Sequence, residues 1–359
     1  MQSKSSILNK TLWAEEIQRV RGPLESRFNK IRLDKNEKPD NHLSKLIKDI
    51  KKNIKHEHLT AYPETEKLYN TISKKFKVKK ESIVLTPGSD AAIKNCLDLF
   101  TEKNDKIISI DPTFAMVDIY SKIKRVKQIK IKYNRKLELD YKKIFETIKN
   151  RKISLVILAN PNSPTGTIIP KRILFNILKS CEKKNIVVLI DEAYFGFYKF
   201  SMIPYIRKFT NLVVCRTFSK AFGLAGCRVG FIATNKKLAN RLYNLRPMYE
   251  INSLGVMIVN EILKKDAFVN KNLNAQLEGK KYLIKEVKKM KLQYLDGNAN
   301  FIHIDLGSKK NKAERTFLKN KILIRGGLNI TGYKNFLRVS LAPKRIMKKV
   351  IKILKDIQR

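Results

Sequence analysis

An acid at the end of an apolar run is the first residue whose setting suggests chemistry. Residues 187–190 are all apolar, and they are followed by Asp191, Glu192, Ala193 and Tyr194. Open α/β sheets bind ligands beyond the carboxyl ends of their strands, so an acid at this place can face a ligand. A turn or a helix cap would also place an aspartate here, so Asp191 alone does not assign a function.

A lysine among small residues is the second candidate. Lys220 follows Ser219, and the next eight residues include two glycines and end in Arg228. Serine and arginine side chains suit a phosphate, and a lysine can form a Schiff base with a carbonyl compound. Because the chain holds 76 lysines and arginines, an ordinary surface ammonium is the other interpretation of Lys220.

Two polar turns are expected beside these residues. The sequence Pro-Gly-Ser-Asp at 87–90 follows one predicted strand and opens a helix, whose free N–H groups favour an anion. The sequence Ala-Asn-Pro-Asn-Ser-Pro-Thr-Gly at 159–166 ends another predicted strand. The chain contains neither GxxxxGK[ST] nor GxGxxG, which counts against the usual nucleotide-binding sites.

These residues require a scaffold of strands, and short apolar runs supply it. Such runs alternate with helical segments, a pattern typical of a largely parallel sheet covered on both faces. We therefore predict an α/β fold. The runs cover residues 83–85, 107–110, 129–131, 155–159, 186–190, 212–215 and 229–233.

The remainder of the chain predicts a smaller α+β unit. Lysine-rich amphipathic stretches at 236–250, 255–265 and 267–291 indicate helices, and a closing helix begins near residue 343. Short strands are expected at 301–305, 322–325 and 336–340. We expect an N-terminal arm at 1–35, a large domain at 36–245 and a small C-terminal domain at 246–359.

Composition limits the classes of protein that the chain can belong to. Hydrophobic residues make up 43% of the 359, which excludes a disordered chain. No apolar run approaches the roughly 18–20 residues of a membrane span, and no signal peptide follows Met1. The four cysteines form no CxxC pair and the four histidines lie apart from them, so we predict no metal site. We expect a cytoplasmic protein.

The net charge of +44 is unusual. It favours contact with nucleic acid, anionic membranes or phosphorylated substrates. The lysines are spread through every segment, however, and lack the interleaved aromatic residues of a single-strand-binding surface. We therefore predict neither a specific nucleic-acid partner nor a membrane partner, and keep a basic nucleic-acid-binding protein as the alternative from a different functional class.

Four motifs in order carry a specific resemblance: Pro-Gly-Ser-Asp, Asn-Pro-Asn-Ser-Pro-Thr-Gly, Asp-Glu-Ala-Tyr and Ser-Lys-Ala-Phe-Gly-Leu-Ala-Gly-x-Arg-x-Gly. The chain resembles class I/II aminotransferases of pyridoxal-phosphate fold type I, most closely the histidinol-phosphate aminotransferase group. Residues 33–39, 62–64, 112–114 and 336–340 extend the match over about 33–345. The resemblance implies a large, mostly parallel seven-stranded sheet domain and a smaller α+β domain.

The resemblance also implies roles for the residues at the centre of the site. Lys220 would hold pyridoxal 5'-phosphate as a Schiff base and later move the substrate proton. Asp191 would keep the pyridine nitrogen protonated. Tyr194 would donate a hydrogen bond to the phenolic oxygen of the cofactor, and Phe114 would stack on the ring where the family usually has tyrosine. Phe114 as a plain core residue remains the alternative.

The phosphate of the cofactor would be bound from both subunits of a homodimer. The resemblance assigns it to Ser89, Asp90, Ser219 and Arg228 of one subunit and to Tyr62 of the partner subunit. The residue pair Tyr62-Pro63 is also compatible with an ordinary turn. Arg338, with Arg325 as a second candidate, would bind the acidic end of the substrate.

Several positions depart from the family pattern. The family usually has asparagine directly before Pro-Thr-Gly, contacting the phenolic oxygen; here Ser163 stands there, and Asn162 precedes it. We assign both to the cofactor. Ala91 and the segment 326–329 also differ, and these positions bear on the acceptor pocket.

The function implied is a transaminase that moves an amino group between glutamate and a small keto substrate such as imidazole-acetol phosphate. A decarboxylase resembling the threonine-phosphate enzyme shares nearly all these motifs. An aminotransferase of surface-polysaccharide or secondary metabolism is the third possibility.

Overall fold

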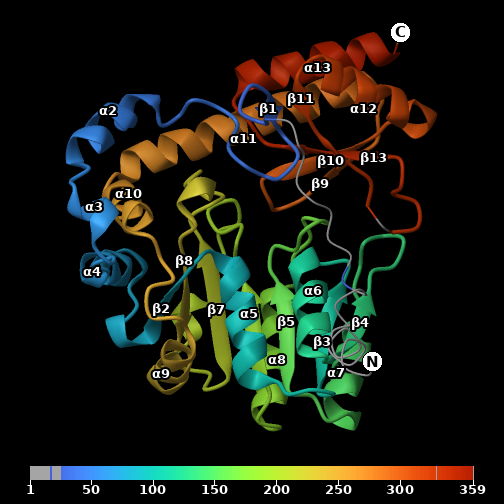
Figure 1. The fold of residues 1–359 in the computed structure, drawn as a ribbon. Helices are drawn as coiled ribbons and strands as arrows, with labels where there is room; N and C mark the ends of the chain where they lie inside the picture. Colours follow the sequence, from blue (N-terminus) through green and yellow to red (C-terminus); the bar gives the residue numbers. More distant parts are fainter. Residues whose placement is uncertain (1–16, 18–25, 329, 359) are drawn as a thin grey trace, which may run out of the picture.

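The computed structural model describes residues 17, 26–328 and 330–358. Its larger part is built on a seven-stranded sheet (Figure 1) in the order β2-β8-β7-β6-β5-β3-β4. Strand β8 is antiparallel to both neighbours and every other pair is parallel, which confirms the predicted α/β fold. The strands are β2 (Ile83–Thr86), β3 (Lys106–Asp111), β4 (Lys127–Lys132), β5 (Leu155–Ala159), β6 (Val187–Asp191), β7 (Leu212–Thr217) and β8 (Gly230–Thr234).

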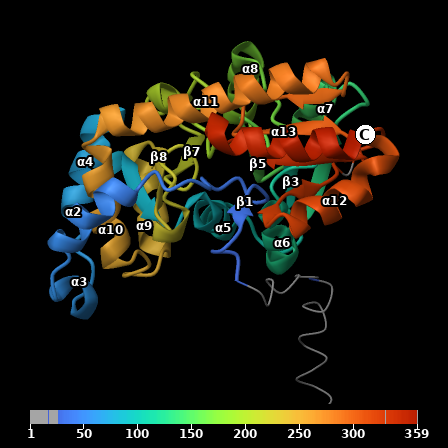
Figure 2. The ribbon, with the colours of Figure 1, turned by 90° about the horizontal axis from the view of Figure 1, so that it is seen from above.

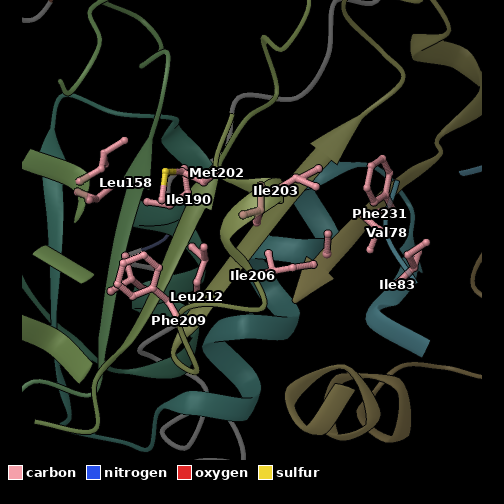
Figure 3. Packing of buried hydrophobic residues seen from close by; sticks show 14 of the residues in the cluster. Val78, Ile83, Leu158, Ile190, Met202, Ile203, Ile206, Phe209, Leu212 and Phe231 are labelled. Atoms are coloured by element: carbon pink, nitrogen blue, oxygen red, sulfur yellow. The ribbon is translucent and has the colours of Figure 1, made fainter. Parts of the chain in front are cut away.

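Helices cover both faces of this sheet. One face packs against α5 (Ser89–Phe100), α6 (Ala115–Lys124) and α9 (Lys236–Leu245). The core of the other face includes α4 (Glu66–Phe76), α7 (Tyr141–Asn150), α8 (Lys171–Glu182) and α10 (Ser253–Leu263). Because side chains alternate along a strand, Ile190 joins the second core, shown in Figure 3, while Leu189 joins the first.

The smaller part has a four-stranded antiparallel sheet in the order β12-β13-β10-β9. Its strands are β9 (Tyr294–Asp296), β10 (Phe301–Asp305), β12 (Arg325–Gly326) and β13 (Phe336–Ser340). Three helices, α11 (Asp266–Lys289), α12 (Lys310–Lys319) and α13 (Lys344–Gln358), share its core. Seen from above, α11 and α13 run side by side over the sheet (Figure 2).

The N-terminal segment joins this smaller part. Strand β1 (Ile31–Arg32) pairs in parallel with β11 (Ile322–Leu323), and Leu33 is fully buried in the small core. Residues 33–38, which we call the strap, then pass between the two parts toward α2 (Ser44–Asn53) and α3 (Glu57–Thr60) (Figure 1). Most of the predicted arm, residues 1–16 and 18–25, lies outside the described residues.

Some elements differ from the sequence-based predictions. The strand expected at 322–325 is two short strands with different partners, β11 with β1 and β12 with β13. The helix expected at 236–250 ends at Leu245, because Arg246 precedes Pro247 and the residue before a proline disfavours the helical conformation.

The two cores meet along α11. Val269 near its start packs against the core of the large sheet, whereas Leu283 near its end belongs to the small core. Helix α10 also belongs with the large sheet. We therefore propose a domain boundary within α11, rather than the expected one at residue 245.

In the part of the chain that the structure describes, no helix has the length and apolarity of a membrane span. The same residues contain no cluster of histidine, cysteine and acidic side chains arranged to hold a metal ion.

Candidate active site

A cavity of about 730 Å³ opens at the carboxyl ends of the parallel strands. The strap, β12 and β13 line it from the opposite side. The structure therefore brings together residues from Lys35 to Arg338, and all the predicted site residues except Asn162 and Tyr62 line this cavity. They are Ser89, Asp90, Phe114, Ser163, Asp191, Tyr194, Ser219, Lys220, Arg228, Arg325 and Arg338.

Asp191 is the last residue of β6, and its side chain lies on the α5 face of the sheet. Its Oδ1 accepts hydrogen bonds from the backbone N–H of Ala193, at 2.9 Å, and from Sγ of Cys215, at 3.5 Å. Burial raises the pKa of Asp191 to about 6, more than these two donors lower it. A buried carboxylate of this kind is stabilised by a cation or a strong N–H donor in the cavity.

Lys220 lies three residues beyond β7. Its Nζ donates a hydrogen bond to the backbone carbonyl of Lys35 in the strap, at 3.0 Å. Burial lowers the pKa of Lys220 to about 8, and the positive charges of Arg338 and Arg228 act in the same direction. A lysine with a lowered pKa is partly neutral near pH 8 and can act as a nucleophile or a base.

The first turn of α5 forms an anion-binding end of the cavity. Ser89 and Asp90 present backbone N–H groups that have no partner within the helix. Gly88 has a φ of +86°, and a Cβ there would lie 3.1 Å from Nη2 of Arg228, so glycine lets the guanidinium lie against this turn. Nη2 of Arg228 also donates to the carbonyl of Pro87, at 3.0 Å.

The side chain of Ser219 favours an anion at this end of the cavity, whereas the carboxylate of Asp90 disfavours one. The hydroxyl of Ser219 accepts from Oγ1 of Thr217, at 2.9 Å, so its own proton is free for an anion. Oδ1 of Asp90 is buried and has no hydrogen-bond partner among the described residues. Since a carboxylate repels an anion, the contribution of Asp90 is its backbone N–H.

Tyr194 lies between the two parts of the molecule. Its ring packs edge-on against Phe301, with centroids 5.6 Å apart. Its hydroxyl accepts a hydrogen bond from Nδ2 of Asn36, at 2.8 Å, and Ser163 lies close enough to act on it. Burial raises the pKa of Tyr194, so the phenol keeps its proton and can donate it in a hydrogen bond.

Asn162 and Ser163, in the turn after β5, have different roles. Asn162 is 1% exposed, and its amide is used within the protein: Oδ1 accepts from Thr113, and Nδ2 donates to the carbonyl of Pro112 and to Thr165. It holds the turn in shape and does not line the cavity. Ser163, the next residue, does line it.

Two arginines form the roof of the cavity. Arg338 of β13 and Arg325 of β12 are directly opposite each other in the antiparallel pair. Nη2 of Arg338 donates to the carbonyl of Asp34, at 2.7 Å, while its buried Nε has no hydrogen-bond partner among the described residues. Two neighbouring guanidinium groups, one of them only partly satisfied, favour an anionic group below them.

Tyr62 lies elsewhere on the molecule. Its side chain is 71% exposed, and its ring stacks on Tyr249 with centroids 3.8 Å apart. A single chain does not bring Tyr62 to its own cavity.

The strap also contributes to the cavity, although none of its residues was among the predicted site residues. Lys35, Asn36 and Glu37 line the cavity, and two of them contact Lys220 or Tyr194. Lys35 acts through its carbonyl oxygen, which every residue possesses, so its identity carries no signal. The signal for Asn36 was a polar run between Leu33 and Pro39 with no strand or helix periodicity.

Comparison with known proteins identifies the family of the chain. The family model for aminotransferase class I and II matches residues 29–354. A histidinol-phosphate aminotransferase of Caldanaerobacter subterraneus subsp. tengcongensis is 32% identical over 331 residues, covering 91% of this chain and 93% of the relative.

Solved structures show the same fold. The histidinol-phosphate aminotransferase of Clostridium acetobutylicum is 26% identical and superposes with a TM-score of 0.79 over 91% of this chain and 99% of that one. The enzyme of Sinorhizobium meliloti, solved with pyridoxal-5'-phosphate, is 19% identical, with a TM-score of 0.84 over 100% and 98% of the two chains. The chain belongs to the class I and II aminotransferases, enzymes of fold type I whose cofactor is pyridoxal phosphate.

Proposed function

We propose that this aminotransferase binds its cofactor in the 730 Å³ cavity and moves an amino group between glutamate and a small phosphorylated keto compound of the imidazole-acetol phosphate type. The observation that carries the proposal is the placement of Lys220 in one cavity between a buried acid, Asp191, and an anion-binding helix end.

The residues present fit pyridoxal phosphate at both of its ends. Within the described residues the buried carboxyl of Asp191 forms no ion pair, although the charge of Lys220 acts on it, and a pyridine N–H would supply a direct partner. The free N–H groups at Ser89 and Asp90, the hydroxyl of Ser219 and the guanidinium of Arg228 are suited to a phosphate.

Each residue then has a chemical task. Bound pyridoxal phosphate supplies an electron-accepting ring, and Asp191 maintains its acceptor strength by keeping the ring nitrogen protonated. Lys220 would take the proton from the α carbon of the substrate and act as the proton carrier of the site, a task that suits its lowered pKa. Tyr194 and Ser163 provide hydroxyl groups for the phenolic oxygen.

The two roof arginines and the relatives both support the proposed substrate class. Arg338 and Arg325 together place two positive charges over the cavity, which suits a carboxylate in one half-reaction and a phosphate in the other. The relatives that are 32–33% identical over 91% of this chain are named histidinol-phosphate aminotransferases, which supports a phosphorylated substrate of that kind.

We infer a homodimer in which Tyr62 of the partner subunit reaches the anion-binding end of the cavity. Tyr62 and its stacking partner Tyr249 are exposed, and so are Leu59 and Met248, with 70% and 74% of their surface accessible. A cluster of exposed apolar and aromatic side chains is typical of a protein interface.

Absorption spectroscopy tests the proposal. The protein purified with pyridoxal phosphate is expected to absorb near the visible region, to lose that band on addition of L-glutamate, and to recover it with imidazole-acetol phosphate. Lys220→Ala should slow the loss of the band on addition of glutamate by more than 100-fold, since no proton carrier remains.

The alternatives give different results. A band that glutamate leaves unchanged indicates another donor, and release of CO2 from a phosphorylated amino acid indicates the decarboxylase. Recovery by a keto sugar but not by imidazole-acetol phosphate would place the enzyme in surface-polysaccharide metabolism. A protein that never acquires the band contradicts the proposal.

A further inference from the structure

The strap contacts the catalytic cavity through three consecutive residues. Each of them holds a different side chain of the site, and together they connect the large and small parts of the molecule. The contacts are Asp34 O with Nη2 of Arg338 at 2.7 Å, Lys35 O with Nζ of Lys220 at 3.0 Å, and Nδ2 of Asn36 with the hydroxyl of Tyr194 at 2.8 Å. Only the last depends on the identity of the strap residue.

Asn36 is held in one orientation by its surroundings. It is 3% exposed, and its backbone N–H donates to Oγ of Ser340, at 3.0 Å. Its Oδ1 lies 3.1 Å from the same Oγ, whose single proton is shared between this oxygen and the carbonyl of Leu33, at 2.8 Å. Its carbonyl accepts from Nδ2 of Asn300, at 3.0 Å. With Oδ1 against Ser340, Nδ2 is the atom that faces Tyr194.

The direction of this hydrogen bond decides what Tyr194 can do. A phenol has one proton, and its oxygen can also accept. Because the Asn36 amide donates, the oxygen of Tyr194 acts as the acceptor and its single proton remains available for a group in the cavity. An acceptor at the same place would draw that proton toward the strap.

We propose that Asn36 is a positioning residue that directs the hydroxyl proton of Tyr194 into the cavity, toward the phenolic oxygen of the cofactor. The inference rests on the proposed function, which places that oxygen beside Tyr194. Asn36 also contacts Ser340 of β13. The direction of the Tyr194 hydrogen bond therefore depends on the small part of the molecule, although Tyr194 itself follows β6 of the large sheet.

The chain offers a matched substitution. Asn36→Asp has the same shape but only acceptor oxygens when ionised, so it draws the Tyr194 proton toward the strap. Asn36→Ala removes the contact. In Asn36→Asp the phenolic oxygen of the cofactor would lose a donor, whereas in Asn36→Ala the Tyr194 hydroxyl keeps its proton but is no longer held in one direction, so its hydrogen bond would weaken. A weaker donor at that oxygen raises the pKa that the visible spectrum reports.

The experiment is a pH titration of the visible spectrum of the holoenzyme. Relative to wild type, the midpoint should rise by roughly half a pH unit to one unit in Asn36→Ala and by more in Asn36→Asp. In a Tyr194→Phe background, Asn36→Ala should add no further rise, because the hydroxyl through which it acts is gone. This double-mutant cycle carries the test even where the aspartate variant does not fold.

Asn300→Ala is the control for strap anchoring. It removes the hydrogen bond to the Asn36 carbonyl without touching the side-chain amide, so it should lower the melting temperature and leave the midpoint unchanged. An equal midpoint shift in Asn300→Ala, an unchanged midpoint in both Asn36 variants, or additive effects with Tyr194→Phe would overturn the role of Asn36 and leave the proposed function standing. A wild-type protein without the visible band would overturn both.

Discussion

The burial of Asp191 links the stability of the chain to the cofactor binding that we propose for this residue. In the chain alone its carboxyl has a pKa near 6, against 3.8 for an exposed aspartate, because burial disfavours the charge. Between these two values the folded chain binds more protons than the unfolded one, so stability falls as the pH rises from about 4 to about 6 and stays lower above it. A cationic partner for this carboxylate would therefore stabilise the folded chain.

Asp191→Asn is expected to stabilise the protein without cofactor and to inactivate it. The amide removes the buried charge while keeping an oxygen for the N–H of Ala193, so above pH 6 the unfolding free energy should rise by about 1–3 kcal/mol. With pyridoxal phosphate present the order should reverse, since only the wild type gains the ion pair. Urea unfolding at pH 5 and pH 8, with and without cofactor, measures both effects.

The exposed Asp356→Asn on α13 removes the same charge from the surface and serves as the control. A wild-type protein that is as stable as Asp191→Asn at pH 8 without cofactor would show that burial does not destabilise this carboxylate.

At the scale of single residues, the motifs predicted most of the side chains that line the cavity but not the hydrogen bonds between them. Asn162 and Ser163 are adjacent and both polar, and only the fold shows that the asparagine holds the turn while the serine lines the cavity. Asn36 was outside the predicted site because its partner, Tyr194, is 158 positions away. Such a contact depends on how two distant segments pack, which a one-dimensional pattern does not contain.

Residues at the carboxyl ends of β6 and β7 alternate between the two faces of the sheet. Asp191 lies on the cavity face, whereas Glu192 and Arg216 lie on the other, where they form a buried ion pair 2.8 Å apart. The guanidinium of Arg216 also lies over the ring of Phe195, 4.3 Å from its centre. This pair joins the two strands that carry the acid and the lysine of the site.

Arg216→Met is expected to cost about 3–5 kcal/mol of unfolding free energy, because it leaves Glu192 charged, buried and unpaired. The double variant Glu192→Gln with Arg216→Met should recover much of this loss. Its glutamine keeps the oxygen that accepts from the backbone N–H of Met202, at 2.5 Å, and removes the charge. Chemical denaturation of the two single variants and the double variant gives the coupling energy. Losses that simply add would mean that the two side chains do not stabilise each other.

At the scale of elements, the parallel sheet was predictable and the small part less so. A strand such as β5 is buried along its whole length and reads as an unbroken apolar run. The split between β11 and β12 has no such signal, because each strand has only two residues and a different partner. Helix α12 is short and rich in lysine, so its apolar stripe is limited to residues such as Ala313 and Phe317.

At the scale of the whole molecule, a row of exposed basic side chains and the exposed aromatic cluster around Tyr62 lie on different elements. The exposed face of α13 carries Lys344, Arg345, Lys348, Lys349, Lys352 and Lys355, opposite a buried apolar face. This arrangement agrees with lysines that decorate solvated surfaces. The exposed Tyr62, Tyr249 and Met248 instead lie together near α3 and α10, where we infer contact with a second subunit.

Mixed dimers test whether the active sites are shared. Lys220→Ala and Tyr62→Ala homodimers should both be impaired, but a dimer with one subunit of each kind should regain one complete site. That site combines Lys220 of the Tyr62→Ala subunit with the intact tyrosine of the other. Co-expression with two affinity tags, followed by activity assays at limiting pyridoxal phosphate, measures the recovery.

Lys220→Ala mixed with Asp191→Ala is the matched control, since both residues act within one chain and no site becomes complete. Equal recovery in the two mixtures, or none in either, would contradict a tyrosine shared across the interface.

The pairing of the strap with the small sheet has a consequence for synthesis on the ribosome. Asn36 and Ser340 are 304 residues apart, so at about 5–20 residues per second the strap waits roughly 15–60 s for its partner strand to be made. During that time the large sheet can already have folded, but its cavity has no roof. Translation must nearly finish before Arg338 receives its strap contact, so the roof is the last part of the cavity to form.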